Sequence, residues 1–353
     1  MKFKAALTWL LSASLALLLT ACDNEKTQIA LEGKTMGTTY HVKYIDDGIK
    51  NLPTPEEMQA HLELLLKIVN DEMSTYQKNS QISGFNELRS TSDYSVSNDF
   101  AKVLEEAIRL NKVTEGALDV TIGPIVNLWG FGPDKRLNKV PAKEQIAERA
   151  KSVGIEKIEV SFEDNDRKNG KGIIRKTDPD LYLDLSSIAK GFGVDKLAEH
   201  LESFGIKNYL VEIGGELRGK GNNLQDQAWR IAIEKPEYEQ GKSTQITVPL
   251  HNLGMATSGN YRNYFEDEQG NRLSHIIDPK TLRPIDHNLA SITVFANTAM
   301  TADGLSTGLF VLGTDKALEI AEREKLAIFL IIKNGKTFDT KMSSEFKKLI
   351  EQK

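Results

Sequence analysis

Polar and apolar residues alternate in several short stretches of the chain, which is the pattern of half-buried β-strands. The longest of these stretches covers residues 35–45, TMGTTYHVKYI. The other predicted strands are short and are bounded by turn residues or by polar segments. They cover residues 158–162, 172–175, 182–185, 208–213, 229–234, 246–250, 292–295 and 327–332.

Apolar residues recur at helical spacing in other segments, as Met58, Leu62 and Val69 do within residues 56–73. Ser97 or Asn98 can cap a helix over residues 98–113. Strands and helices are mixed without a regular βαβ repeat, which predicts an α+β fold with one large mixed α/β body of two intimate subdomains. The remaining helices are predicted over residues 142–153, 186–204, 299–311 and 315–323.

The first 22 residues have the pattern of a secretion signal. Lys2 and Lys4 precede residues 5–21, which carry no charge and are short for a bilayer-spanning helix. Small residues lead directly into Cys22 in the sequence LTAC. We expect residues 1–21 to be a lipoprotein signal peptide and Cys22 to be lipidated after cleavage. The alternative is an uncleaved membrane anchor with an incidental cysteine.

Composition adds limits on location and partners. Cys22 is the only cysteine, so the body after it forms no disulfide. The formal net charge of −5 becomes about −7 when the two signal lysines are removed, and no basic patch suggests nucleic-acid binding.

Residues 22–34 are predicted to be the lipidated cysteine and a tether, followed by a domain over residues 35–345. Asp23 resembles the inner-membrane retention signal of enterobacterial lipoproteins, which predicts the periplasmic face of the inner membrane.

Residues 184–191, DLSSIAKG, form the first candidate site. Asp184 ends a predicted strand, Ser186 and Ser187 begin a predicted helix, and Lys190 lies in its first turns. Free N–H groups at a helix start favour phosphate, and a lysine adds a positive point charge. The same residues could form an ordinary serine N-cap with a solvent-facing lysine.

Residues 300–308, MTADGLSTG, form the second candidate site. Asp303 and Thr307 are four residues apart, so on a helix they share one face. A carboxylate and a hydroxyl suit Mg²⁺, a hard cation that prefers oxygen ligands. In the alternative interpretation Asp303 is a helix-start cap and Thr307 is a small packing residue.

Three further segments carry weaker signals. His275, in HIIDP, could act as a general base or be structural. Residues 257–265, TSGNYRNYF, could line a ring-binding pocket or form a turn followed by a strand. Gly214 and Gly215 follow a predicted strand and allow close approach of a ligand or another backbone. No Gly-x-Gly-x-x-Gly or Walker A motif is present, so a dinucleotide would not bind in the Rossmann manner.

Together the motifs match one family. The chain resembles the ApbE-type, Mg²⁺-dependent FAD:protein FMN transferases over about residues 33–340, and many members of this family are periplasmic lipoproteins. Nine motifs in the expected order are far more specific than any one of them. They are KTMGT at 34–38, STY at 74–76, GALDVT at 116–121, NLWG at 127–130, DLSSIAKG at 184–191, EIGGE at 212–216, TSG at 257–259, HIIDP at 275–279 and TADG at 301–304.

The resemblance implies an activity and a set of cofactor contacts. Family members move FMN from FAD to a Ser or Thr hydroxyl of a target protein through a phosphoester bond, and AMP leaves. A membrane redox subunit with an exposed acceptor loop is the expected target. Met36 and Tyr76 are expected on the flavin side, and Asp184 and Lys190 near the phosphates or ribose. The full set of implied FAD contacts is Met36, Tyr76, Ala117, Leu118, Asp119, Asp184, Lys190 and Ile276.

The resemblance also implies a Mg²⁺ site formed by the side chains of Asp303 and Thr307 and the backbone carbonyl of Ser187. The acceptor hydroxyl is a weak nucleophile at neutral pH and needs a base. His275 is our candidate for that base, and Asp184 is the competing candidate.

Asn260 stands where many relatives carry Asp. If the family uses that carboxylate for chemistry, this chain should be impaired. We expect the residue only to shape the pocket.

The same residues are consistent with other functions. An FAD pyrophosphatase would pass FMN to water instead of a protein. A non-catalytic flavin-binding lipoprotein would not need the Asp303–Thr307 pair. Residues 303–307, DGLST, also resemble the acceptor sequence of flavinylated proteins, so self-modification is a further possibility.

Overall fold

The computed structural model describes residues 26–133, 140–234, 244–260, 264–266 and 272–351. Within these ranges no helix combines the length and the apolar character needed to cross a bilayer. The predicted signal peptide and its cysteine lie outside the described residues, as do the first residues of the predicted tether.

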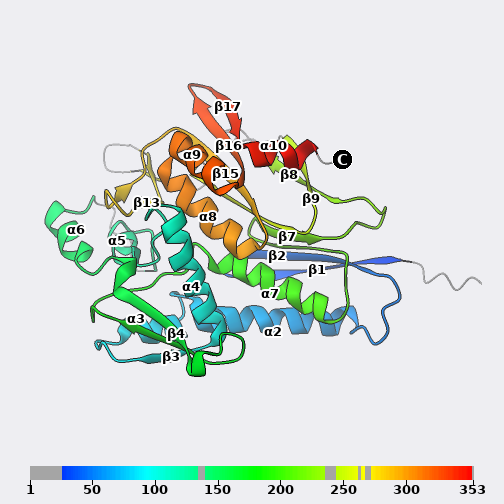
Figure 1. Ribbon diagram of the computed structural model, residues 1–353, viewed down its shortest axis with the longest axis horizontal. Coiled ribbons are helices and arrows are strands. Elements are labelled where there is room, and N and C mark those ends of the chain that lie inside the picture. Colours follow the sequence, from blue (N-terminus) through cyan, green and yellow to red (C-terminus); the bar gives the residue numbers. More distant parts are fainter. Residues whose placement is uncertain (1–25, 134–139, 235–243, 261–263, 267–271, 352–353) are drawn as a thin grey trace, which may run out of the picture.

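An antiparallel sheet of eight strands forms the centre of the molecule (Figure 1). Its strand order is β1 (Thr27–Thr35), β2 (Thr38–Asp46), β6 (Tyr209–Ile213), β7 (Glu216–Lys220), β10 (Leu253–Gly259), β15 (Leu289–Ala296), β16 (Ala327–Asn334) and β17 (Thr337–Met342). A smaller sheet has the order β3 (Tyr94–Val96), β5 (Gly172–Lys176) and β4 (Ile158–Phe162). The separate hairpins pair β8 (Trp229–Glu234) with β9 (Thr244–Leu250), β11 (Tyr264–Glu266) with β12 (Arg272–Ser274), and β13 (Ile277–Asp278) with β14 (Arg283–Pro284).

Helices cover one face of the large sheet. There α7 (Ala189–Ser203) and α8 (Ala299–Leu312) lie against the strands and against each other, and α2 (Pro55–Met73) packs beside α7 (Figure 1). The β8–β9 hairpin and α10 (Ser344–Glu351) pack on the opposite face. The remaining helices are α3 (Gln81–Glu87), α4 (Asn98–Val113), α5 (Gly123–Leu128), α6 (Lys143–Ala150) and α9 (Thr314–Glu324).

One hydrophobic core connects the two sheets. Ile174 of the small sheet and Ile292 of the large sheet belong to the same buried cluster, in which α4 and α8 lie between them. The shared core makes the two subdomains one body, which confirms the predicted α+β fold. The α4 boundaries also agree with the prediction, and Ser97 rather than Asn98 is the cap because its Oγ accepts from Phe100 N at 3.0 Å.

The expectation that residues 27–34 belong to a tether is wrong. They form β1, which pairs with β2 along its whole length. Ile29 and Leu31 turn toward the helix-covered face, where they pack against buried residues of the core, while Gln28, Ala30 and Glu32 are exposed. This period-two pattern is short and lies among polar residues, so it is weak in the sequence.

Two predictions around residue 184 are also wrong. Residues 182–185 are not a strand, because the Asn86 side chain accepts from Leu183 N at 2.8 Å and donates to Leu183 O at 2.9 Å. This side chain satisfies the backbone groups that a neighbouring strand would otherwise pair with. Helix α7 begins at Ala189 and not at Ser186, and the Ser186 hydroxyl donates to Asp184 instead of capping the helix.

Candidate functional site

Met36 lies in the tight turn that joins β1 to β2. Met36 and Gly37 are the two loop residues, and both have positive φ values, 48° and 73°. Two-residue hairpin loops with positive φ at both positions favour Asn and Gly, so a methionine there is unusual. Its side chain reaches α7, where a methyl group placed on Gly193 would lie only 3.1 Å from Met36 Cε.

A pocket of about 970 Å³ opens beside this turn. Met36, Tyr76 and Lys190 line it, so three of the predicted FAD contacts lie around one cavity. Tyr76 is 68% exposed, and α2 supplies an apolar wall that includes Leu66 and Val69. The other predicted contacts, Ala117, Leu118, Asp119, Asp184 and Ile276, are not part of the lining.

Lys190 joins this pocket to a buried cluster of charges. Its Nζ lies 3.0 Å from Glu216 Oε1 and 3.8 Å from Asp303 Oδ1. Asp303 Oδ2 accepts from the backbone N–H of Gly191 at 2.9 Å. Asp303 therefore does not cap its own helix: Thr298 caps α8, and Asp303 instead caps α7, which has no side-chain cap at Ile188.

Burial controls the protonation of this cluster. It raises the pKa of Glu216 to about 8 and raises the pKa of Asp303, although Lys190 opposes both shifts. Burial alone would lower the pKa of Lys190, but the two carboxylates raise it. Glu216 Oε2 is buried and has no hydrogen-bond partner among the described residues. Within the described residues, the cluster thus leaves one oxygen of Glu216 without a donor.

Hydroxyl groups of α8 lie close to a hydroxyl group of β10. Asp303 and Thr307 both belong to this helix, so their spacing places them on one face, as predicted. Ser258 Oγ of β10 lies 2.8 Å from Ser306 Oγ and 3.5 Å from Thr307 Oγ1. Residues 257–259 are the last three residues of strand β10, so they do not begin a turn. Ser187 is half-buried in the segment just before α7.

The predicted metal ligands are oxygen donors. The described ranges contain no group of three or more His, Cys, Asp or Glu side chains arranged around a common point, so a zinc-type site is absent from them. Asp303 with the Thr307 hydroxyl and the Ser187 carbonyl would give oxygen ligands only. The ammonium group of Lys190 beside Asp303 indicates that positive charge is stabilised at this point.

Asp184 lies next to the segment that was predicted to contact the cofactor. Its N–H donates to Val120 O at 2.8 Å, and its carboxylate accepts from Ser186 N at 2.9 Å. Partial burial and the negative charge of Asp184 raise the pKa of Tyr76, so Asp184 acts on the pocket electrostatically.

The predicted contacts at residues 117–119 have their side chains committed to the fold. Ala117 and Leu118 are 3% and 2% exposed. The Asp119 carboxylate accepts from both the N–H and the hydroxyl of Thr121, at 2.8 and 2.6 Å, and burial raises its pKa. The side chains of Ala117 and Leu118 are therefore unavailable to a cofactor, whereas the half-buried Asp119 uses only its Oδ1 in these two bonds.

His275 and Ile276 lie on a different element. They connect β12 to β13, and the half-buried His275 ring meets Phe131 edge-on with ring centroids 6.5 Å apart. Ile277 of β13 packs with Trp129, whose Nε1 donates to Leu282 O at 3.0 Å. The β13 strand contacts α8, so His275 is held beside the helix that carries Asp303 but not in the pocket wall.

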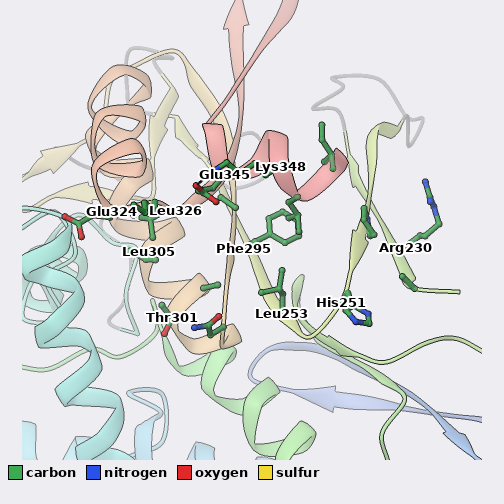
Figure 2. A pocket seen from close by; sticks show the side chains of 18 of the residues that line it. Arg230, His251, Leu253, Phe295, Thr301, Leu305, Glu324, Leu326, Glu345 and Lys348 are labelled. Carbon is green, nitrogen blue, oxygen red and sulfur yellow. Dashed lines mark hydrogen bonds and ion pairs between the residues drawn. The ribbon is translucent and has the colours of Figure 1, made fainter. Parts of the chain in front are cut away.

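A larger cavity of about 1370 Å³ lies on the other side of α8 (Figure 2). Thr301 and Leu305 face it from α8, while Arg230 and His251 face it from the β8–β9 region. Thr301 and Leu305 lie on the helix face opposite Asp303. None of the predicted site residues lines this cavity, so it is separate from the candidate site.

Two buried carboxylates with central positions were missed by the sequence reasoning. Glu216 was part of a motif, but only its glycines were considered. Asp195 was not singled out at all, although it interrupts the otherwise apolar inner side of α7 between Val194 and Leu197. A charged residue inside a run of core positions is the signal that could have identified it.

Comparison with known proteins agrees with this geometry. The sequence model of the ApbE family matches residues 36–330. The FAD:protein FMN transferase of Haemophilus influenzae is 56% identical over 351 residues, covering 99% of both chains, and that of Vibrio cholerae is 47% identical over 345 residues, covering 98% of this chain and 99% of the relative.

Solved structures show the same fold. The flavin transferase ApbE from Vibrio cholerae superposes with a TM-score of 0.82 at 45% identity and covers 92% of this chain and 99% of its own. The apo flavinyl transferase ApbE of Pseudomonas stutzeri gives a TM-score of 0.82 at 36% identity, covering 92% of this chain and 97% of its own. On these matches, the chain belongs to the ApbE family.

Proposed function

We propose that the chain is an FAD:protein FMN transferase, which moves FMN from FAD to a Ser or Thr hydroxyl of a target protein and releases AMP. Relatives with this name are 56% and 47% identical over nearly the whole chain. One structural observation carries the proposal. Lys190 lines the pocket that contains Met36 and Tyr76, and it also contacts the buried Asp303 and Glu216. The cavity proposed for the flavin and the cluster proposed to hold Mg²⁺ with the phosphate groups therefore meet at one side chain.

The finer part of the proposal is a Mg²⁺ site. Asp303 and Thr307 would supply side-chain oxygens, and Ser187 would supply its carbonyl. When bound, Mg²⁺ would neutralise charge on the pyrophosphate oxygens. The ammonium group of Lys190 would orient the same phosphates from the pocket side.

The proposed reaction is a phosphoryl transfer. The acceptor hydroxyl oxygen bonds to the phosphorus of the FMN half, and the bond from that phosphorus to the bridging oxygen breaks. AMP leaves with the bridging oxygen, and the hydroxyl proton passes to a base. We propose His275 as this base, because the competing Asp184 carboxylate already accepts hydrogen bonds from Ser186.

A single assay separates the possible activities. The purified full-length chain is incubated with FAD, Mg²⁺ and a candidate acceptor, and covalent flavin fluorescence is recorded on a denaturing gel. Labelled acceptor supports the transferase, whereas AMP and free FMN without labelled protein would support a pyrophosphatase. No turnover of FAD would contradict both enzymes. Flavin on the enzyme itself in the absence of acceptor would indicate self-modification.

We also propose that Cys22 carries the lipid and that the body lies on the periplasmic face of the inner membrane. Because β1 begins at Thr27, the proposed tether would span at most roughly 18 Å, which would keep the enzyme close to a membrane redox subunit as its target. The Cys22→Ser chain should carry no lipid, and the same body secreted behind a signal peptide that is cleaved without lipidation should leave the membrane fraction. Membrane association equal to that of the unaltered chain would contradict the proposed anchor.

A further inference from the structure

Asp195 of α7 is buried at the start of α8. Its Oδ1 accepts from Ala299 N at 3.0 Å, and its Oδ2 accepts from Met300 N at 2.8 Å. These two residues begin α8, and their amides have no partner inside the helix. Asp195 is only 4% exposed, so both bonds form away from water. Its carboxylate therefore fixes the first turn of α8 in position.

The two helices also touch at backbone level, which leaves little room for α8 to shift. A methyl group placed on Gly191 would lie 2.3 Å from Ala299 O and 2.8 Å from Asp303 Cβ. Gly254 of β10 is equally close from the sheet side, since a methyl group there would lie 2.3 Å from Ala299 N. A small displacement at the start of α8 would thus be transmitted to Asp303.

Side chains of strand β7 contact both Lys190 and Asp195. Glu216 and Arg218 are two residues apart on the strand, so their side chains point to the same face of the sheet. Glu216 contacts Lys190, and Arg218 Nη1 donates to Asp195 Oδ1 at 3.0 Å. The guanidinium group partly compensates the negative charge of the Asp195 carboxylate, whose pKa is raised by burial.

We propose that Asp195 is a positioning residue for the metal site. By accepting the N–H groups of Ala299 and Met300, it sets the position of α8 along and around the helix axis, and this determines where Asp303 and Thr307 lie. This inference rests on the proposed Mg²⁺ site. Asp303 lies four residues after Ala299, about one helical turn or roughly 6 Å along the axis, so the helix connects the two points rigidly. Asp195 has no described contact with the pocket and acts through α8.

The test uses Mn²⁺ as a spectroscopic substitute for Mg²⁺. Mn²⁺ is titrated into the full-length chain mixed with FAD but no acceptor, and the free ion is followed by electron paramagnetic resonance. Asp195→Asn, which keeps one acceptor oxygen, should weaken Mn²⁺ binding several-fold, and Asp195→Ala should weaken it by at least tenfold. Ser97→Ala is the matched control, because it also removes a helix cap but on α4.

A general loss of structure and the loss of a positioning contact predict different results for the Asp195 variants. If Asp195 positions the ligands, high Mg²⁺ should restore the turnover of Asp195→Asn, and the KM for FAD should change little. Mn²⁺ binding by Asp195→Asn as tight as in the unaltered chain would overturn the inference and leave the proposed function intact. Flavin transfer by an unaltered chain that binds no Mn²⁺ would instead overturn the proposed metal site. If Asp195→Ala does not fold, Arg218→Met provides the second variant and should weaken Mn²⁺ binding in the same direction.

Discussion

Asp195 and Asp303 lie on neighbouring helices, and each carboxylate accepts a backbone N–H from the first turn of the helix that carries the other. Helix starts present free N–H groups and a partial positive charge, so each anion is well placed. The exchange makes α7 and α8 one unit. That unit carries Lys190 and Asp303, the two residues at which the pocket and the proposed metal site meet.

Removing the charge of Asp303 should abolish metal-dependent transfer. We expect Asp303→Asn to lower the rate of flavin incorporation by at least about 10²-fold, because preorganised charge in a water-poor site supplies effects of this size. The measurement is covalent flavin on the acceptor at saturating FAD and Mg²⁺. Asp315→Asn alters a carboxylate that is 93% exposed at the start of α9 and should leave the rate unchanged. A normal rate in Asp303→Asn would show that the metal site is wrong.

Gly191 should tolerate no side chain. Gly191→Ala would force the added methyl group against the backbone of Ala299, and we expect a loss of roughly 2–3 kcal/mol in the free energy of unfolding measured with urea. Gly193→Ala, on the same helix, is the matched control. Its methyl group would meet the flexible ends of Met36, Ile213 and Leu66, at 3.1, 3.2 and 3.7 Å, so a smaller loss is expected. Equal losses would refute the backbone contact as the cause.

Met36 should matter more for cofactor binding than for stability. Met36→Gly relieves a left-handed conformation that costs about 1 kcal/mol but removes partly buried side-chain contacts, so the free energy of unfolding should change by no more than about 1 kcal/mol. The affinity for FAD, measured by flavin fluorescence, should fall at least several-fold because the side chain lines the pocket. Unchanged FAD affinity would remove Met36 from the binding site.

Glu72 should make stability depend on pH. It is 7% exposed on α2, and burial raises its pKa to about 7 from 4.5, although a hydrogen bond from Ser97 opposes the shift. The folded state therefore holds a proton that the unfolded state releases, and stability falls as pH rises from about 4.5 to about 7. One pKa unit corresponds to about 1.4 kcal/mol, so the loss amounts to a few kcal/mol at most.

Urea unfolding at pH 5 and pH 8 tests this expectation. Glu72→Gln cannot ionise, so its stability relative to the unaltered chain should improve at pH 8 compared with pH 5. Glu87→Gln, at an exposed position on α3, controls for loss of a negative charge. The same stability difference at both pH values would mean that Glu72 is ionised in the folded protein.

Much of the secondary structure follows from local patterns. Residues 98–113 form α4 with the predicted ends, and residues 158–162 and 229–234 form β4 and β8, because cap residues and apolar spacing are visible within one element. Residues 182–185 have an equally strand-like pattern, but the Asn86 side chain takes the backbone bonds of Leu183. Asn86 is 97 residues away in the chain, so no local pattern could show this.

The sequence by itself determined the family motifs, the Asp303–Thr307 spacing on one helix and the mixed α+β architecture, since each depends on residue identity and short-range periodicity. Only the tertiary structure decided which groups meet. It brought Asp303 to Gly191, 112 residues away, and Asp195 to Met300, 105 residues away. Such contacts form because buried carboxylates and helix-start amides must be satisfied when water is excluded, and the satisfying partner is set by packing and not by sequence distance.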